Sequence, residues 1–450
     1  MSRKQQSSSL RRGISFGTVF MTAITVVVLG LSAAVFPRLL SSSAFDMNIS
    51  GAVAALTLDD SLTALSLSDI PINEPTATPS PDIEPQQPQI VSPATPVPTA
   101  TPIPGGKVTL TIGGSVNIDD AVRKSAYYSD SKKYDFTEIM MLLEDEMQSD
   151  ITLVTLENLT CDTEKVSAVN APSVVMDMLA QSGVDIVSLG YPQALDKGLA
   201  PLQTTIGEAQ KRGMATLGAY ANQADADALR MFKVDNVSVA FLHYTETISS
   251  AGKKIIKSNQ ADYTLPTTLV DGTPEAMLAD IRRAKEKGAD VIVVTLNWGK
   301  NGAKPTAAQN AIAQQLADAG ADVIIGTGSK IVQPVTWLTA RKEYGSIRHT
   351  LCAWNLASLL TGERNDGNVC GMLLQLQIAF DGDSISFEKV CYTPTYIWRY
   401  KQDGQYHYRI AVSDQPAPDG MAEDQTGYME KALRNLQKYL GDSPVTLREK

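Results

Sequence analysis

The feature that most constrains the fold is a series of short apolar segments that alternate with helical patterns from residue 107 onward. Each apolar segment is rich in β-branched residues, as in 291–296 (VIVVTL), which is typical of a buried strand. Strands are expected at 108–112, 151–156, 184–189, 216–218, 291–296 and 323–325, with two more within 232–244. Helices are expected at 136–148, 171–181, 202–212, 274–287 and 307–319. Further β segments at 350–354, 371–380 and 385–392 complete the pattern of a layered α/β sandwich with mixed sheets.

Composition excludes several classes of function. The chain of 450 residues carries a net charge of -10, which argues against nucleic acid as a partner because such proteins present a basic face. Only three histidines occur, which is few for a histidine-based metal site. The four cysteines, Cys161, Cys352, Cys370 and Cys391, show neither CxxC pairing nor zinc spacing.

The N-terminal region predicts a single membrane anchor. Residues 1–12 are basic, and residues 13–36 form an uncharged apolar stretch close to the roughly 20 residues needed to span a bilayer. After Arg38 no Lys or Arg appears until Lys107, so we expect a cytoplasmic N-terminus and an extracellular bulk. A cleaved signal peptide is the alternative, with small residues at 32–34. We favour the retained anchor because the apolar stretch is longer than a typical signal-peptide core.

A linker separates this anchor from the folded part. It covers residues 37–106 and is rich in Pro and Thr from residue 71, a composition that cannot bury a core and predicts a disordered, semi-rigid tether. The folded domain is expected over residues 107–400. Residues 401–450 form a C-terminal extension, polar at first and then helical over about 428–440.

The stretch from Gly183 to Gly198 carries a family resemblance. Its strand ends in a polar loop, the place where α/β proteins usually hold their chemistry. The stretch is similar to V-S-L-A-N-N-H-x-x-D-x-G, a signature of the CapA family of poly-γ-glutamate capsule biosynthesis proteins, whose domain resembles a calcineurin-type metallophosphatase. Val187, Ser188, Leu189, Asp196 and Gly198 match, whereas Tyr191, Pro192 and Gln193 replace Asn-Asn-His.

Five further landmarks of the family follow in order. The family's Gly-Asp-x-Met corresponds to 113–116, where Gly114 replaces the ligand Asp, and Asn-Leu-Glu corresponds to 155–157, where Glu157 remains. His-Trp-Gly has become Asn297-Trp298-Gly299. Gly-x-His-Pro-His-Val corresponds to 326–331, with Lys330 at a ligand position, and Gly-Asn-Phe to 354–356, with Asn355 retained.

The resemblance implies a calcineurin-like sandwich whose metal site is degenerate. Water-activating metal sites need several anionic or imidazole ligands, and Glu157 is the one strong ligand left, so we expect no metal and no cofactor. The residues expected around the old pocket are Glu157, Tyr191, Gln193, Asn297, Trp298, Lys330 and Asn355. Lys330 is expected to fill the place of the ion and to pair with Glu157. Glu157 is also the candidate catalytic residue if any hydrolysis survives.

Simpler interpretations accompany these residues. Glu157 can also be explained as an ordinary ion-pair partner. Asp196 can be explained as the N-terminal cap of the helix after Gly198. Trp298 either lines a pocket or closes the sandwich. The loop at 326–330 also resembles an anion cradle, but it lacks phosphate-loop spacing.

The histidines and cysteines are assigned in the same way. His243 is expected to be a satisfied core or edge histidine, and His349 and His407 are expected at the surface. Cys370 and Cys391 either form a bridge across the hairpin predicted at Asp381-Gly382 or are two small buried strand residues.

Together these features predict a membrane-anchored extracellular protein that acts in the synthesis, export or anchoring of a cell-surface polymer such as poly-γ-glutamate. The degenerate metal positions favour a non-catalytic binding or assembly role over an enzyme. The alternatives are a metal-dependent hydrolase with a weakened or relocated site, and a structural envelope protein. The expected partners are the membrane, an anionic polymer and proteins of envelope biosynthesis.

Overall fold

The computed structural model of the protein describes residues 105–162, 170–299, 302, 304–341, 347–365, 367, 369–382 and 384–448. The predicted membrane anchor at 13–36 and nearly all of the predicted linker lie outside these residues. Within the described part of the chain, none of the helices has the length and apolar character needed to cross a bilayer.

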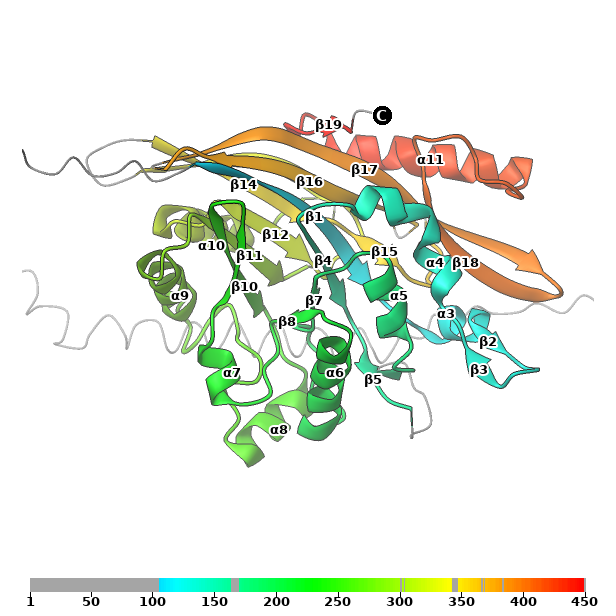
Figure 1. Ribbon diagram of the computed structural model, residues 1–450, viewed down its shortest axis with the longest axis horizontal. Coiled ribbons are helices and arrows are strands. Elements are labelled where there is room, and N and C mark those ends of the chain that lie inside the picture. The colour runs from blue at the N-terminus through cyan, green and yellow to red at the C-terminus, as the bar shows by residue number, and fades with distance from the viewer. Residues whose placement is uncertain are drawn as a thin grey trace, which may run out of the picture. The chain divides into compact units, whose positions relative to one another are not determined.

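Two β-sheets organise the domain (Figure 1). In the nine-stranded first sheet, β1 is central: it pairs parallel with β4 and antiparallel with β16. The strand order is β18 (Gln405–Val412), β17 (Ile385–Gln402), β16 (Cys370–Phe380), β1 (Gly106–Val116), β4 (Ile151–Leu156), β7 (Ile186–Ser188) and β8 (Ala215–Leu217), with β15 (Ser358–Leu360) beside β1 and β19 (Thr446–Leu447) beside β17.

The second sheet has six strands, and its four central strands are parallel, as expected where crossover helices join the strands. Their order is β13 (Gln333–Arg341), β14 (Ile347–Asn355), β12 (Val323–Thr327), β11 (Val291–Asn297), β10 (Val237–Thr245) and β9 (Arg230–Val234). Two short ribbons lie outside the sheets: β2 (Tyr127–Tyr128) with β3 (Lys133–Tyr134), and β5 (Leu159–Thr160) with β6 (Asn170–Ala171).

Helices cover the outer faces of both sheets, and the inner faces pack against each other. The first sheet is covered by α3 (Asp120–Ser125), α4 (Thr137–Met140), the 3-10 helix η1 (Met141–Met147), α5 (Val175–Gln181) and α6 (Leu199–Lys211). The second is covered by α9 (Glu275–Glu286) and α10 (Ala307–Ala319), while α11 (Glu423–Leu440) packs on β13, β16 and β17. Two shorter helices, α7 (Gln223–Asp227) and α8 (Ser250–Asn259), flank β9 and β10. The predicted layered α/β sandwich with mixed sheets is therefore confirmed.

The alternation of side chains along β4 explains why this strand has no polar face. Ile151 and Leu153 enter the core between the sheets, whereas Val154 and Leu156 enter the core beneath the outer helices. Successive strand residues point to opposite faces, and here each face meets another layer. Full burial of each such side chain contributes about 1.5–3 kcal/mol.

The C-terminal region is more closely integrated than the sequence suggested. Residues 401–450 do not form a separate extension, because β18 and β19 both pair with β17 of the first sheet. The hydrophobic pattern of the sequence did not indicate β18, because β18 is an edge strand. Its first residues are exposed, and only Tyr408 and Ile410–Val412 are buried. The strand β13 and the helix α8 were also not predicted.

The register of the β16–β17 hairpin decides between the two interpretations of Cys370 and Cys391. Cys370 lies opposite Tyr396, and Cys391 lies opposite Gln375, so the two cysteines do not face each other. Both side chains are buried. The hairpin itself is confirmed, and the interpretation as two small buried strand residues is the one observed.

Candidate functional site

The retained and replaced landmarks converge where strands of the two sheets end side by side. Glu157 follows β4 of the first sheet, and Asn297 ends β11 of the second. The Ser115 hydroxyl donates to Glu157 Oε1 at 2.9 Å, and the Asn297 amide donates to the same oxygen at 3.4 Å. A register shift between Ile112 and Ser115 in the β1–β4 pairing accompanies this arrangement. Residues far apart in sequence thus form one polar cluster.

The carboxyl group of Glu157 is partly buried, and burial has the largest effect on its pKa. Burial raises its pKa because the charged form loses water. The hydrogen bonds from Ser115 and Asn297, and then the charge of Lys330, act in the opposite direction and lower the pKa. The cluster therefore holds a carboxyl group whose charged form is disfavoured overall.

The expected pairing of Lys330 with Glu157 is corrected by the structure. The Lys330 ammonium forms its ion pair with Glu363, and the two side chains are 34% and 44% exposed. Its charge acts on Glu157 electrostatically. Lys330 thus stands at the rim of the cluster, in a pair that solvent screens.

Tyr191 and Asn355 are buried, and each has a polar atom without a partner among the described residues. The Tyr191 hydroxyl is one such atom, and burial together with the charges of Glu157 and Asp196 raises its pKa well above the usual value. Asn355 accepts a hydrogen bond from the Ala357 N–H at 2.8 Å, but its amide nitrogen has no described partner. Buried polar groups usually are paired, so these two atoms are exceptions within the described part of the chain.

The position of the family's metal-ligating Asp is sterically closed. A Cβ atom on Gly114 would lie 2.0 Å from the Ala357 carbonyl oxygen. The neighbouring Ser115 N–H donates to that same oxygen at 3.1 Å, which holds the two segments together. Gly299 is equally enclosed, because its Cβ would lie 2.0 Å from the Ser329 nitrogen. This backbone therefore leaves no room for a side chain at position 114 or at position 299.

Three other predicted residues lie away from the cluster's polar centre. Trp298 is 2% exposed and stacks on Trp354 with ring centroids 5.8 Å apart, so it closes the sandwich. Gln193 is exposed at the surface. Asp196 does not cap the following helix, since α6 has no side-chain cap; it accepts a hydrogen bond from Ser249, the N-cap of α8.

His243 is confirmed as a satisfied core histidine, and it links the two sheets. Its Nε2 lies 2.8 Å from the Gly190 carbonyl oxygen and its Nδ1 2.9 Å from Ser188 Oγ in β7. A Cβ on Gly190 or on Gly218 would lie within 2.4 Å of the imidazole, so both glycines are needed to admit the ring. Burial lowers its pKa to about 4. Two glycines directly after neighbouring strands were the sequence signal for this arrangement.

The donor set does not fit a divalent metal ion. One partly buried carboxylate, a serine hydroxyl and an asparagine amide converge, whereas such sites need several anionic or imidazole ligands. Across the residues that the structure describes, no group of three or more His, Cys, Asp or Glu side chains is placed to hold a metal. The cluster offers hydrogen bonds instead.

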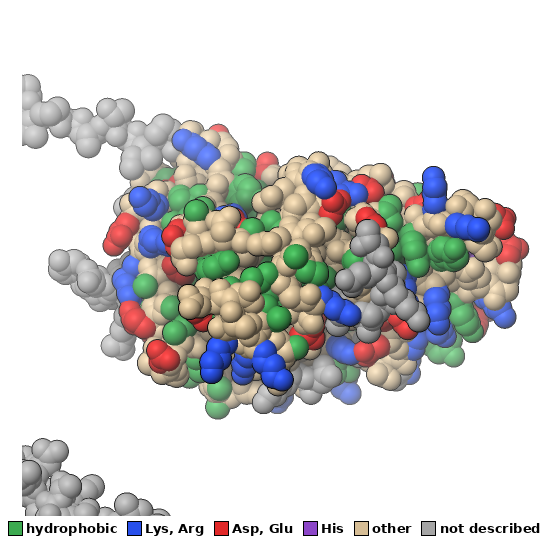
Figure 2. All heavy atoms as spheres, turned by 90° about the horizontal axis from the view of Figure 1, so that it is seen from below, with side chains coloured by type: hydrophobic (Ala, Val, Ile, Leu, Met, Phe, Trp, Pro, Cys, Tyr) green, Lys and Arg blue, Asp and Glu red, His purple; other side chains and the backbone are tan. Residues whose placement is uncertain are grey.

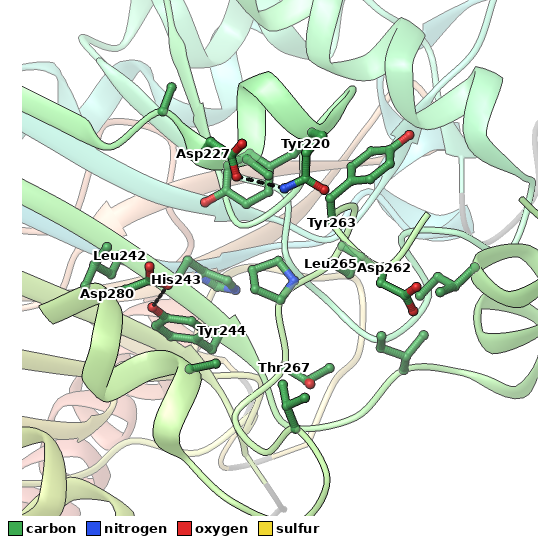
Figure 3. A pocket seen from close by; sticks show the side chains of 18 of the residues that line it. Tyr220, Asp227, Leu242, His243, Tyr244, Asp262, Tyr263, Leu265, Thr267 and Asp280 are labelled. Carbon is green, nitrogen blue, oxygen red and sulfur yellow. Dashed lines mark hydrogen bonds between the residues drawn. The ribbon is translucent and has the colours of Figure 1, made fainter. Parts of the chain in front are cut away.

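A cavity of about 760 Å³ lies beside the end of β10 (Figure 3). The sequence did not predict it. Its walls come from β10, α8 and the chain before and after them, and include Tyr220, Tyr244 and Tyr263. Figure 2 looks onto the side of the molecule that carries α7 and α8, where Lys and Arg side chains lie among Asp and Glu. Glu157 does not line this cavity.

Comparisons with known proteins agree with these landmarks. The model of the bacterial capsule synthesis protein family (PGA_cap) matches residues 109–360. Over 160 residues the chain is 31% identical to the PGA biosynthesis protein CapA of Bacillus subtilis (strain 168), covering 35% of this chain and 40% of that protein. Over 168 residues it is 27% identical to the capsule biosynthesis protein CapA of Bacillus anthracis, covering 36% and 39%. The chain thus aligns with about two fifths of these relatives' length.

Two solved structures are also similar. One is a hypothetical protein from Thermus thermophilus, with a TM-score of 0.36 and 14% identity, covering 64% of this chain and 98% of that one. The other is described as a novel phosphatase from Mycoplasma pneumoniae, with a TM-score of 0.37 and 11% identity, covering 64% and 93%.

Proposed function

The chain belongs to the bacterial capsule synthesis protein family, whose model matches more than half of its length, and on this premise we propose that it binds a capsule-type polymer at the cell surface without hydrolysing it. On this proposal the α/β sandwich is of the calcineurin type, and its former metal site no longer binds a metal ion. The polymer is of the poly-γ-glutamate class that the family resemblance implies, and the role lies in synthesis, export or anchoring.

The observation that carries this proposal is the polar cluster around Glu157. In metal-dependent acyl or phosphoryl hydrolysis the metal ion polarises the substrate and lowers the pKa of bound water, and several anionic or imidazole ligands must hold that ion. Here a neutral hydroxyl and a neutral amide surround one carboxylate, and Gly114 has no room for a side chain. The donors that remain favour binding by hydrogen bonds over catalysis.

The cellular setting is the second part of the proposal. We take residues 13–36 to be a retained single-pass anchor and the Pro/Thr-rich segment before residue 106 to be a tether. The domain would then stand on the outer side of the membrane, where a growing or exported polymer passes. Envelope biosynthesis proteins are the expected neighbours.

The binding role is tested on the purified full-length chain in detergent. We expect it to retain poly-γ-glutamate in co-sedimentation, to contain no stoichiometric Mn, Fe or Zn by elemental analysis, and to release no shortened polymer. Stoichiometric metal together with hydrolysis that Glu157→Ala abolishes would establish the hydrolase alternative. Absence of polymer retention would leave the structural envelope role.

The anchor is tested separately in cells that carry a tag at each end of the chain. We expect both tags on one membrane-bound product, with only the C-terminal tag open to external protease. A mature product that has lost the N-terminal tag would show a cleaved signal peptide, contrary to the proposal.

A further inference from the structure

A second cavity, of about 710 Å³, is lined by both sheets near the turn of the β16–β17 hairpin. We call it the aromatic groove, because its apolar wall consists mainly of Trp337 of β13, Ile347 of β14, Phe380 of β16, and Ile385 and Phe387 of β17. Trp337 is 37% exposed and Ile347 is 63% exposed, so this wall is open to solvent. A continuous exposed apolar patch usually marks a contact surface.

The two rings in the groove are arranged to receive a proline-rich chain. The rings of Trp337 and Phe387 lie 5.0 Å apart between centroids and are inclined at 70°, which leaves two aromatic faces at an angle. The indole N–H of Trp337 has no hydrogen-bond partner among the described residues. A polyproline II helix offers the complementary groups, because its rings pack on aromatic faces and its carbonyl groups form no internal hydrogen bonds.

The charged side chains of the groove do not call for a charged ligand. Each Asp, Lys and Arg among them already has a partner: Lys285 donates to the Ala319 carbonyl at 2.9 Å, Asp322 pairs with Arg348 at 3.3 Å, and Asp290 accepts from the Ser238 N–H at 2.7 Å. The remaining titratable side chain of the groove, His349, is exposed on β14. An uncharged, apolar chain is therefore the best match.

The protein's own chain enters the domain at this groove. Gly106 lies opposite Phe380 in the β1–β16 pairing, and a Cβ on Gly105 would lie only 2.6 Å from the Phe380 carbonyl oxygen. The nine residues before Gly105, residues 96–104, lie outside the described part and read PVPTATPIP. This segment contains four prolines and no charged residue.

The segment is long enough to cover the groove. In the polyproline II conformation nine residues span about 28 Å, at about 3.1 Å per residue. Ile385 lies opposite Phe380 in the hairpin, and Phe387 follows two residues later, which is about 7 Å farther along the strand. Trp337 packs on Phe387, so both rings are within reach of a chain that starts beside Phe380.

We propose that the aromatic groove binds residues 96–104 of the same chain in the polyproline II conformation, with proline rings against Trp337 and Phe387. This inference is independent of the polymer-binding role. The last part of the tether then belongs to the folded domain, and the tether leaves the domain from a fixed face rather than from a free joint.

The groove carries its own fluorescent reporter. Trp337 is 37% exposed, whereas the other three tryptophans are at most 2% exposed. Acrylamide quenching of the full-length chain, corrected with the variant Trp337→Phe, therefore measures how much of Trp337 is open to solvent. For a local concentration of about 1 mM and a Kd of about 0.1 mM, the segment covers Trp337 in about nine molecules of ten.

Two prolines of the segment are then replaced together. Pro98→Ser with Pro102→Ser frees two backbone angles that proline fixes, and a loss of affinity of about tenfold would leave about half of the molecules open. We expect the quenchable fraction of Trp337 to rise about fivefold.

The chain provides a matched control, because the sequence PTATP occurs both at 98–102 and at 75–79. Pro75→Ser with Pro79→Ser makes the same change in the same five residues, farther from the domain along the chain. We expect quenching to stay at the wild-type value. Equal effects of the two double variants, or a wild-type chain in which Trp337 is already fully quenchable, would overturn the proposal.

A photochemical cross-link identifies the occupant directly. With benzoylphenylalanine in place of Ile103 in the full-length chain, we expect cross-links within one chain to the peptides that contain Trp337 or Phe387. The same group in place of Thr78, in the control sequence, should give none. Cross-links only between two chains would show that a second copy occupies the groove, and no groove cross-link from position 103 would show that the segment does not bind there; either result rejects the proposal.

Discussion

The sharpest prediction concerns protonation of His243. His243 is 1% exposed, and both ring nitrogens are engaged: Nε2 with the Gly190 carbonyl at 2.8 Å, Nδ1 with Ser188 Oγ at 2.9 Å and Thr295 Oγ1 at 2.8 Å. A carbonyl can only accept, so Nε2 carries the proton and Nδ1 accepts. A second proton on Nδ1 would remove that acceptor and place a charge in the core between the two sheets.

The magnitude follows from the shift in pKa. Burial lowers the pKa of His243 from 6.5 to about 4, and each unit corresponds to 1.36 kcal/mol, which gives about 3 kcal/mol. Because the pKa is lower in the folded state, the unfolded chain binds the proton more readily. The contribution is therefore fully present above pH 6.5 and is lost as the pH falls toward 4.

The assay is urea unfolding of the full-length chain between pH 4 and pH 7, followed by tryptophan fluorescence. All four tryptophans lie in the described domain, so the signal reports on its unfolding. We expect the wild type to lose about 3 kcal/mol more than His243→Gln over this interval. Other titrating groups act in both proteins and cancel in the difference. The exposed His349→Gln variant is the control and should follow the wild type.

A second measurement applies even if His243→Gln does not fold. The three histidines can be labelled with nitrogen-15 and assigned with the His349→Gln and His407→Gln variants. We expect one imidazole to remain neutral down to about pH 4. If the His243 signal titrates near pH 6.5, or if the wild type and His243→Gln show the same pH dependence, the reasoning from burial is refuted.

Three further predictions concern the polar cluster. Gly114→Asp should bind no metal by elemental analysis and should destabilise the fold by about 1–3 kcal/mol, since its Cβ would collide with the Ala357 carbonyl; stoichiometric metal would contradict this. Glu157→Gln should raise the free energy of unfolding at pH 7, because burial raises the pKa of Glu157 and the wild type therefore loses stability as the pH rises above 4.5; the gain should vanish in acid. Lys330→Ala should cost less than about 1 kcal/mol in urea unfolding, because its pair with Glu363 is exposed to solvent, and a larger loss would point to a buried role.

The sequence by itself determined the order and kind of most elements. The strand at 151–156 and the helix at 307–319 match β4 and α10 to the residue, since an uninterrupted apolar run and a helical period bounded by Thr306 and Gly320 are local signals. Thr306 forms a capping box with Gln309, which fixes the start of α10. Element type and family membership could be predicted because each pattern or motif that indicates them consists of residues close together in the chain.

The tertiary structure alone decided which residues meet. Lys330 pairs with Glu363 in place of Glu157, and the hairpin register separates Cys370 from Cys391, because partner choice depends on strand register and loop path. The closure over Gly114 likewise arises because Ala357, from a segment far away in the chain, packs against it. Periodicity reports which face of an element is buried; only the packed sheets determine what lies opposite that face.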